Sequence, residues 1–303
     1  GHRITCYDNN EKIIKNINNG KPNIHEPGLD SLLKSVLKNG NFRAHLISNK
    51  TLFNEDLIII AVDTPLADNG KINLSNIITI SEQIGNYLKK NNNFLSIIVK
   101  STVIPGTTDN VIRKIIENCS KKKLGDFGLG MNPEFLREGS AIQDFMEPDR
   151  IILGHEDNKT LSLLKKLYKS WNCDKLFVNT RTAEMIKYAN NSLLALQISA
   201  ANELANIVSG IGGIDISEVM NGVYADKRWS PRTKSNKRIS PEILTYLAPG
   251  AGFGGSCLPK DLQALCSRSS EVGVETKIFN AVLAVNENQP YQIINILERS
   301  LNG

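Results

Sequence analysis

The chain has 303 residues, of which 41% are hydrophobic and 22% are charged, and its formal net charge is +5. This composition is typical of a globular protein, and the length allows two domains with ordinary cores. The longest apolar run, Leu57–Val62, is far too short to cross a bilayer, and no secretory signal opens the sequence, so we expect no membrane association. The longest basic run, Lys121–Lys123, lies on a predicted loop, so we expect no nucleic-acid partner.

The first predicted strand, Arg3–Tyr7, ends at Asp8. An acidic residue that closes such a strand usually binds the ribose hydroxyls of NAD in a Rossmann fold, where this strand is the second. The first strand and its GxGxxG loop are then expected about 20 residues earlier, before this sequence begins. We therefore interpret the sequence as a fragment. The alternative is a complete protein in which Asp8 merely ends an edge strand.

Strand-like and helical segments alternate from the start of the sequence to about residue 180. Short, continuous apolar strands separated by helices indicate a parallel sheet that is covered on both faces. For residues 1–180 we therefore predict a doubly wound, Rossmann-like α/β domain, truncated at its N-terminus. The predicted strands are Arg3–Tyr7, Leu57–Val62, Ser96–Lys100, Gly128–Met131, Ile151–Gly154 and Lys175–Val178, and the predicted helices are Leu74–Lys90, Thr107–Cys119 and Lys159–Ser170.

The sequence changes character after Val178. From Thr182 to Ser209 it contains no proline or glycine, which predicts one helix of about 28 residues, roughly 42 Å long. This helix has apolar residues on more than one face, so we expect a two-fold dimer built on the second half of the chain. For residues 181–303 we predict an all-helical domain. Its further predicted helices are Ile216–Met220, Pro241–Leu247, Leu258–Glu271 and Glu275–Leu301.

The segment GFGGSCLPKD, residues 252–261, has the pattern of a loop that presents a nucleophile. Its glycines let the backbone approach a ligand closely, and Pro259 suits the first turn of the following helix. Cys257 lies just before that helix, with Lys260 beside it, and both features favour the thiolate. Asp261 follows by four residues and can lie over the same surface. The alternative is an inert, buried cysteine beside a glycine turn.

The other cysteines, at positions 6, 119, 173 and 266, lack a glycine loop and a helix start. The total of five is odd, and no CxxC pair occurs. A reducing cytoplasm is the setting that this usage favours. We assign no metal site.

Three features resemble the nucleotide-sugar dehydrogenases, the family of UDP-glucose and GDP-mannose 6-dehydrogenases. They are GFGGSCLPKD, the segment NPEFLREG at residues 132–139, and Lys187 and Asn191 four residues apart on the long helix. The resemblance implies NAD as cofactor, a nucleotide sugar as substrate, a dimer through the central helical domain, and a nucleotide-binding domain after residue 303. We accordingly expect both ends to be cut, so that this fragment alone binds NAD weakly and is inactive.

The resemblance also implies roles for individual residues. Cys257 becomes the nucleophile, Lys187 and Asn191 stabilise an oxyanion on the sugar carbon, and Glu138 or Asp261 activates water. Glu138 is also the candidate base for the sugar hydroxyl. The residues implied to bind NAD are Asp8, Thr64, Thr102, Glu138 and Lys260, and Thr102 also contacts a catalytic water. The residues implied to bind substrate are Glu134, Phe135, Leu136, Arg137, Glu138, Lys187, Asn191, Arg228, Tyr246, Leu247, Gly250 and Gly254.

Two of these assignments depend on local pattern. Glu134 and Glu138 are four residues apart and could share one helical face. Arg228 ends an Asp-x-Arg pattern whose arginine, in the family, reaches the substrate of a neighbouring subunit. Here the basic stretch Trp229–Arg238 follows, which shorter relatives lack.

The reaction that the resemblance implies is a four-electron, NAD-dependent oxidation of a sugar hydroxymethyl group to a carboxylate. The cysteine captures the intermediate aldehyde and carries it to a thioester. A UDP-sugar of the UDP-glucose type is preferred, and GDP-mannose is the alternative. Two other interpretations remain: an NAD enzyme of β-hydroxy acids, which needs no nucleophilic cysteine, and a non-catalytic dimerisation module.

Overall fold

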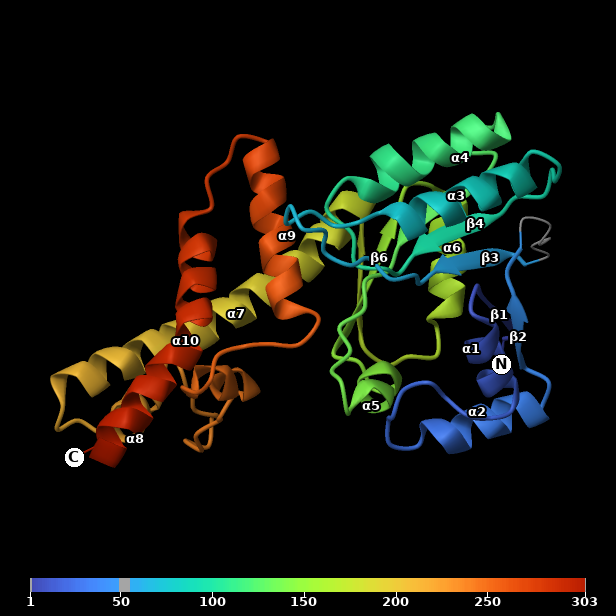
Figure 1. Cartoon of the computed structure of the whole chain (residues 1–303). Coiled ribbons are helices and arrows are strands. Elements are labelled where there is room, and N and C mark those ends of the chain that lie inside the picture. The colour runs from blue at the N-terminus through green and yellow to red at the C-terminus, as the bar shows by residue number, and fades with distance from the viewer. Residues whose placement is uncertain (1, 49–54, 303) are drawn as a thin grey trace. The chain divides into compact units, whose positions relative to one another are not determined.

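The computed structural model describes residues 2–48 and 55–302. The chain forms two compact units, the first made of Gly1–Thr64 and Leu74–Lys187, the second of Pro65–Asn73 and Tyr188–Gly303. Figure 1 shows the elements of both units, coloured along the chain. Within the described residues, no helix combines the length and apolar character needed to span a bilayer.

The strands described in the first unit form two sheets. β1 and β2 make a parallel pair, with Ile4 opposite Phe42. The other five strands form one sheet in the order β3-β4-β5-β6-β7, so each strand lies beside its neighbour in the sequence. The bounds are β1 Ile4–Asp8, β2 Phe42–Leu46, β3 Leu57–Ile60, β4 Ser96–Val99, β5 Gly128–Met131, β6 Arg150–His155 and β7 Asp174–Val178.

The five-stranded sheet is covered on both faces, as the sequence predicted. Ile97 and Val99 of β4 pack in a cluster with residues of helices α3 (Ser75–Leu88) and α4 (Arg113–Ser120), which lie side by side (Figure 1). Ile98 points to the opposite face and packs with Leu164 of helix α6 (Asn158–Leu167) and with Tyr168 just after it. Successive side chains of a strand alternate between the two faces, so a strand covered on both sides is apolar without interruption.

Two features of the sheets differ from the prediction. β5 and β6 pair antiparallel, because the chain between Met131 and Arg150 forms only a loop and the short helix α5 (Ala141–Met146), and it returns along the same edge without crossing the sheet. Strand β2 was not predicted. Its sequence FRAHL alternates apolar and polar residues, and only Ala44 is buried, so it lacks the continuous apolar run of the central strands.

The remaining helices of the first unit are α1 (Glu11–Asn18), α2 (Leu29–Lys38) and α6 (Asn158–Leu167). The predicted helix at 107–119 is divided, because a π-helical turn, η1 (Thr107–Ile112), precedes α4. Gly106 begins this turn with a φ of 94°. That angle lies in the left-handed region, which glycine adopts without steric cost.

Helix α7 (Thr180–Ile211) belongs to both units, because their boundary falls between Lys187 and Tyr188. It extends the predicted helix by two residues at each end. Over 32 residues it is about 48 Å long.

The second unit is helical. Its elements after α7 are α8 (Ile216–Tyr224), the 3-10 helix η2 (Glu242–Leu247), α9 (Leu258–Glu271) and α10 (Lys277–Asn302). One apolar cluster joins Phe253, Leu262 and Val282, and a second joins Met220, Leu244 and Leu247 to α7 through Ala201. Within the described part of this unit, β structure is limited to the isolated bridges Leu66–Ile72 and Arg232–Arg238.

Candidate active site

Three of the predicted cofactor residues, Asp8, Thr64 and Thr102, lie at or just after the carboxyl ends of strands of the first unit. Asp8 closes β1, and its Oδ1 accepts a hydrogen bond from the Asn10 N–H at 2.8 Å, which fixes the carboxylate at the strand end. Thr64 follows β3 and is 8% exposed; its hydroxyl donates to the Thr102 carbonyl oxygen at 2.7 Å. Thr102 itself follows β4, so this bond ties together the loops after two neighbouring strands. Carboxyl ends of parallel strands are where open α/β sheets bind ligands.

A buried ion pair, Lys187–Glu134, joins helix α7 to the segment that follows β5. Lys187 is 4% exposed, and its Nζ lies 3.0 Å from Glu134 Oε1. The same Nζ lies 5.4 Å from the centre of the Phe135 ring, and the Arg150 guanidinium lies 4.4 Å from that ring. A lysine in the middle of a helix is ordinarily solvated, whereas Lys187 is buried and paired with Glu134.

A second lysine of this cluster was not singled out from the sequence. Lys100 ends the predicted strand at β4, and its Nζ donates to Asn132 Oδ1 at 3.1 Å. Asn132 Oδ1 also accepts from the Tyr168 hydroxyl, and Asn132 Nδ2 donates to the Ile152 carbonyl oxygen. Burial lowers the pKa of Lys100 to about 8; Glu134 acts in the opposite direction, and Lys187 lowers the pKa further. The sequence signal that could have pointed to Lys100 is a charged residue directly after an apolar strand.

The segment 132–139 corrects one prediction. Glu134 and Glu138 do not share a helical face, because residues 132–137 form no helix and Gly139 has a φ of 86°. Pro133 and the left-handed glycine both oppose a helix here. Glu134 Oε2 accepts from the Leu136 N–H and Oε1 binds Lys187, whereas Glu138 is exposed.

Two other predicted substrate residues of this segment, Arg137 and Leu136, differ in whether they are engaged by neighbouring residues. Arg137 forms a two-point ion pair with Asp144 of α5, from Nε at 3.1 Å and Nη2 at 2.7 Å. Its guanidinium is therefore already engaged within the loop. Leu136 is 37% exposed.

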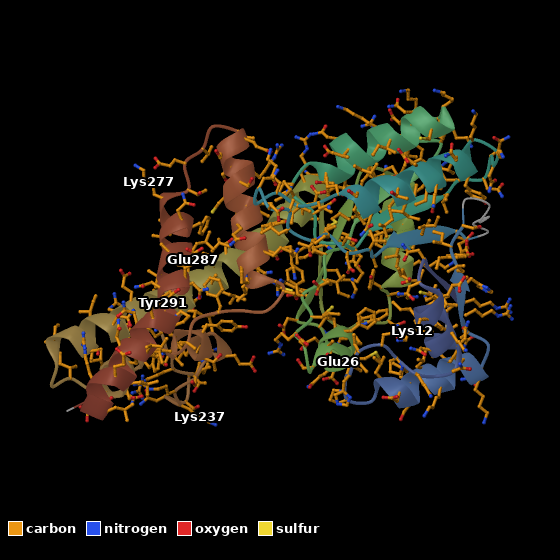
Figure 2. The ribbon with its side chains drawn as sticks, viewed as in Figure 1. Lys12, Glu26, Lys237, Lys277, Glu287 and Tyr291 are labelled. Atoms are coloured by element: carbon orange, nitrogen blue, oxygen red, sulfur yellow. The ribbon has the colours of Figure 1, made fainter. Side chains whose placement is uncertain are left out.

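Two buried glutamates hold loops of the first unit, and the sequence interpretation missed both. Glu26 is 4% exposed and accepts from the N–H groups of Gly139 and Ala141, so it fixes the end of the 132–139 segment at the start of α5 (Figure 2). Glu184 is fully buried on α7 and accepts from Gly106 N–H at 2.6 Å and Thr108 N–H at 2.8 Å. Glu184 precedes Lys187 by three residues on α7, but this spacing does not reveal its partners, which are backbone groups.

Burial raises the pKa of Glu184 to about 7, although the hydrogen bonds from Thr108 and Gly106 oppose the shift; the nearby Asp109 adds to it. Arg181 pairs with Asp109, at 2.6 Å between Nε and Oδ2. The carboxyl group that holds the loop after Thr102 therefore titrates close to neutrality.

In the second unit, Cys257 is the N-cap residue of α9 and is exposed, whereas the other four cysteines are partly buried. Its sulfur lies 3.6 Å from the Ser256 hydroxyl oxygen. Pro259 occupies the first turn of α9, as predicted. The thiol thus lies at the positive end of a 14-residue helix.

Asp261 lies one turn into α9 and is 1% exposed. Its Oδ2 accepts from Asn191 Nδ2 of α7 at 2.7 Å, and its Oδ1 lies 3.1 Å from Lys260 Nζ. Asn191 is 6% exposed, so this is a buried, charge-assisted bond between the two predicted residues. Lys187 and Asn191, four residues apart, follow the same side of α7.

The remaining predicted substrate residues occupy the segment between α8 and α9. Arg228 is exposed, and its Nε and Nη2 donate to the Asp226 carboxylate, which holds the pKa of Asp226 well below its usual range. Leu247 is 7% exposed and packs in the second apolar cluster, whereas Tyr246 beside it is half-buried. Gly250 and Gly254 are exposed.

Two domain models of one enzyme family match the chain. Residues 1–172 match the NAD-binding domain of the UDP-glucose/GDP-mannose dehydrogenase family, and residues 181–288 match its central domain. The GDP-mannose 6-dehydrogenase of Pseudomonas aeruginosa is 36% identical over 298 residues, which cover 98% of this chain and 66% of the relative. The UDP-glucose 6-dehydrogenase of Rickettsia conorii is 34% identical over 304 residues, covering 100% of this chain and 65% of the relative.

Solved structures agree with this match. A UDP-glucose dehydrogenase from Pyrobaculum islandicum superposes with a TM-score of 0.89 at 36% identity, over 100% of this chain and 66% of that one. The GDP-mannose dehydrogenase of Pseudomonas aeruginosa gives a TM-score of 0.72 at 37% identity, over 95% of this chain and 64% of that one. The chain thus spans just under two thirds of the length of these relatives. The NAD-binding model alone matches more than half of the chain, which makes NAD the cofactor and shows that the chain belongs to the UDP-glucose/GDP-mannose dehydrogenase family.

Proposed function

We propose that this protein oxidises the C6 hydroxymethyl group of a nucleotide sugar, of the UDP-glucose type, to the uronic acid through a covalent intermediate on Cys257. The observation that carries the proposal is the exposed Cys257 thiol at the N-cap of α9, at the end of a glycine-rich loop. An exposed cysteine at a helix N-terminus is placed as a nucleophile would be, whereas a packing cysteine is usually buried. The alternative function, NAD-dependent oxidation of a β-hydroxy acid, needs no nucleophilic thiol.

Bound NAD supplies the hydride acceptor for the two oxidations. Asp8, Thr64, Thr102, Glu138 and Lys260 are the residues that we propose to hold it. The fit to NAD rests on Asp8, Thr64 and Thr102. The second oxygen of the Asp8 carboxylate can accept a hydrogen bond from a ribose hydroxyl. Thr64 and Thr102 lie in the loops that follow two neighbouring strands, and one hydrogen bond joins these loops. These groups suit a dinucleotide better than a metal, since one carboxylate and two hydroxyls offer weak ligands.

Glu138, Lys187 and Asn191 serve the first oxidation. Loss of hydride from the alcohol carbon requires that the hydroxyl proton leave, and Glu138, exposed at the end of its loop, is the proposed base. Negative charge develops on the sugar oxygen as the proton leaves. The Lys187 ammonium stabilises it, with Asn191 as the amide donor, and fixed donors of this kind lower barriers by several kcal/mol. The Glu134 carboxylate holds the ammonium in place.

Cys257 serves the second oxidation. Its thiolate adds to the aldehyde carbon, a C–S bond forms, and the carbonyl oxygen takes a proton to give a thiohemiacetal. Loss of hydride from that carbon and of the hydroxyl proton gives a thioester. Water activated by Asp261 or Glu138 then adds, the C–S bond breaks, and the thiolate and the acid are released. Covalent capture divides one hard oxidation into easier steps and retains the aldehyde.

The experiment that tests this proposal replaces the nucleophile in the whole protein. Cys257→Ser should abolish uronate formation while NAD and nucleotide sugar still bind, and a slowly hydrolysed serine ester should accumulate as an adduct seen by mass spectrometry. Cys266→Ala is the matched control on the same helix and should keep wild-type turnover. Uronate production at the wild-type rate by Cys257→Ala would end the covalent mechanism.

A second substrate, GDP-mannose, is supported by the similarity to GDP-mannose 6-dehydrogenases. Steady-state kinetics of the whole protein with UDP-glucose and GDP-mannose separate the two. We expect the larger kcat/KM with UDP-glucose. A β-hydroxy acid is included in the same panel, and its selective oxidation would replace the nucleotide-sugar assignment.

We also propose a homodimer through the helical second unit. Large apolar side chains stay exposed on α10, where Tyr291 (labelled in Figure 2) is 66%, Leu297 56% and Leu301 83% exposed, and on α7, where Ile211 is 69% exposed. Exposed apolar patches of this kind mark protein contacts. Sedimentation velocity at tens of micromolar should show a dimer, and a strictly monomeric species would refute the proposal.

A further inference from the structure

The loop that leads to Cys257 is held by side-chain amides rather than by secondary structure. Asn202 Oδ1 of α7 accepts from the Gly250 N–H at 2.7 Å, and Gln289 Nε2 of α10 donates to the Gly250 carbonyl oxygen at 2.9 Å. Asn286 of α10 bonds both backbone groups of Phe253, accepting from its N–H at 2.7 Å and donating to its carbonyl at 2.9 Å. Four backbone groups of one loop are therefore bound by three amide side chains, which we call the amide clamp.

The chemistry of the amide explains why these residue types occur here. An amide side chain offers both a donor and an acceptor, so one residue can satisfy the N–H and the C=O of the same loop residue. A carboxylate only accepts, and a lysine only donates. Asn286 thus bonds Phe253 as a neighbouring strand would. The clamp also carries no charge and does not titrate in the range where a thiol ionises.

The clamp is itself supported by its surroundings. Asn206 of α7 donates to Gln289 Oε1 at 3.0 Å, and Gln289 is 4% exposed. Gly252 lies against it, with a φ of 93°, and a Cβ there would come within 2.5 Å of Asn286 Oδ1. Pro290 lies inside α10, which bends along its length (Figure 1). Proline has no N–H for the carbonyl four residues earlier, that of Asn286, so the bend occurs beside the clamp.

The clamp ends a short distance before the nucleophile. Phe253 is 8% exposed and packs in the cluster with Leu262 and Val282. Cys257 follows four residues later, and Asp261, four residues further, is anchored by Asn191. The sulfur is therefore carried by a short exposed segment between two fixed points. The amide clamp fixes the first of these points.

One clamp residue is retained at a cost. Asn202 is fully buried, and its Nδ2 has no acceptor among the described residues. An unpaired buried amide N–H destabilises a fold. An apolar residue would avoid that penalty but would leave the Gly250 N–H without its acceptor. Asn202 thus fixes the position of the loop through the Gly250 N–H, while its own unpaired N–H lowers the stability of the fold.

We propose that Asn286, Gln289 and Asn202 are positioning residues that set the place of the Cys257 sulfur for capture of the aldehyde. The proposal rests on the proposed function. A thiolate must approach the carbonyl carbon to about 3 to 3.5 Å from above the carbonyl plane, and a misplacement of about 1 Å can cost up to about 100-fold in rate. Loosening the clamp should therefore slow the thiol-dependent oxidation far more than the first oxidation, which does not use the thiol.

The test compares Asn286→Ala with Asn288→Ala, an exposed asparagine two residues further along α10. The first readout needs no catalysis: hydrogen exchange of the amides from Phe253 to Cys257 and the iodoacetamide alkylation rate of Cys257, by mass spectrometry. Asn286→Ala should speed exchange by about tenfold or more and change the alkylation rate, whereas Asn288→Ala should match the wild type. Asn286→Asp keeps the acceptor for the Phe253 N–H and should fall between.

The second readout uses the whole protein with its sugar nucleotide. Asn286→Ala should lower acid formation by about tenfold or more, with aldehyde formation within about threefold of wild type, so that free aldehyde is trapped by semicarbazide. Equal loss of both oxidations, or exchange and alkylation within about twofold of Asn288→Ala, overturns the proposal. If Asn286→Ala does not fold, Gln289→Met is judged by the same criteria. A wild-type protein that forms no acid refutes the proposed function, and the exchange and alkylation data still decide the clamp.

Discussion

Two loops of this protein are fixed by side chains that reach them from helices, but by opposite chemistry. In the first unit, the Glu184 carboxylate accepts from Gly106 and Thr108. In the second unit, neutral amides hold Gly250 and Phe253. The carboxylate binds only N–H groups and is buried with a pKa raised to about 7, whereas the amides bind both kinds of backbone group and do not titrate. The loop after Thr102 is thus held by a pH-sensitive bond, and the loop before Cys257 is not.

Among the variants that test this difference between the two loops, Glu184→Ala is expected to change the free energy of unfolding most. Removal of the carboxylate leaves two buried N–H groups without an acceptor, at about 1–3 kcal/mol each, so we expect the free energy of unfolding to fall by about 2–6 kcal/mol. Urea denaturation measures it. Glu203→Ala, an exposed glutamate on the same helix, is the matched control and should change stability by less than about 0.5 kcal/mol. Equal effects of the two variants would show that Glu184 holds nothing.

The next effect concerns pH. The folded chain holds the Glu184 proton more tightly than the unfolded chain between pH about 4.5 and about 7, because burial raises the pKa from 4.5 to about 7. Raising the pH through this window should therefore lower the free energy of unfolding by at most about 1.4 kcal/mol per pH unit. Glu184→Gln should remove this component. The measurement is the wild-type minus Glu184→Gln difference at several pH values, and a difference that stays constant would contradict the assignment.

The smallest effect tests the neutral loop. Asn286→Ala removes two hydrogen bonds of a partly buried side chain, so we expect a loss of about 1–2 kcal/mol. Because an amide has no proton to gain or lose in this range, the loss should be equal at pH 5 and pH 8. If the stability difference between wild type and Asn286→Ala changed with pH as the difference for Glu184→Gln should, the two loops would not differ in their sensitivity to pH.

The sequence predicted the strands of the sheet core and the long helix to within two residues, because continuous apolar runs and an uninterrupted helical stretch are strong local signals. It missed β2, whose half-buried alternation is weak, and the antiparallel β6, whose direction depends on how the preceding loop returns. It also expected a helical face for Glu134 and Glu138, which Pro133 and Gly139 prevent.

The candidate site shows the same division. Motif resemblance selected Lys187, Asn191 and Asp261, which the structure buries and pairs. The residues that hold the loops were missed: Glu184, Glu26 and the amide clamp. Their partners are backbone groups 33 to 115 positions away. A backbone partner leaves no mark in the sequence, so only the fold reveals such bonds.

Gly254, in the exposed segment before Cys257, has a consequence for how this sequence can change. A Cβ there would meet nothing within 4 Å, and its φ lies outside the left-handed region, unlike that of Gly252 and Gly255. The described fold therefore leaves room for a Cβ at position 254, so we expect any need for glycine there to come from what approaches the loop from outside. A saturation library at this position would report on the space that a bound molecule needs, separately from folding.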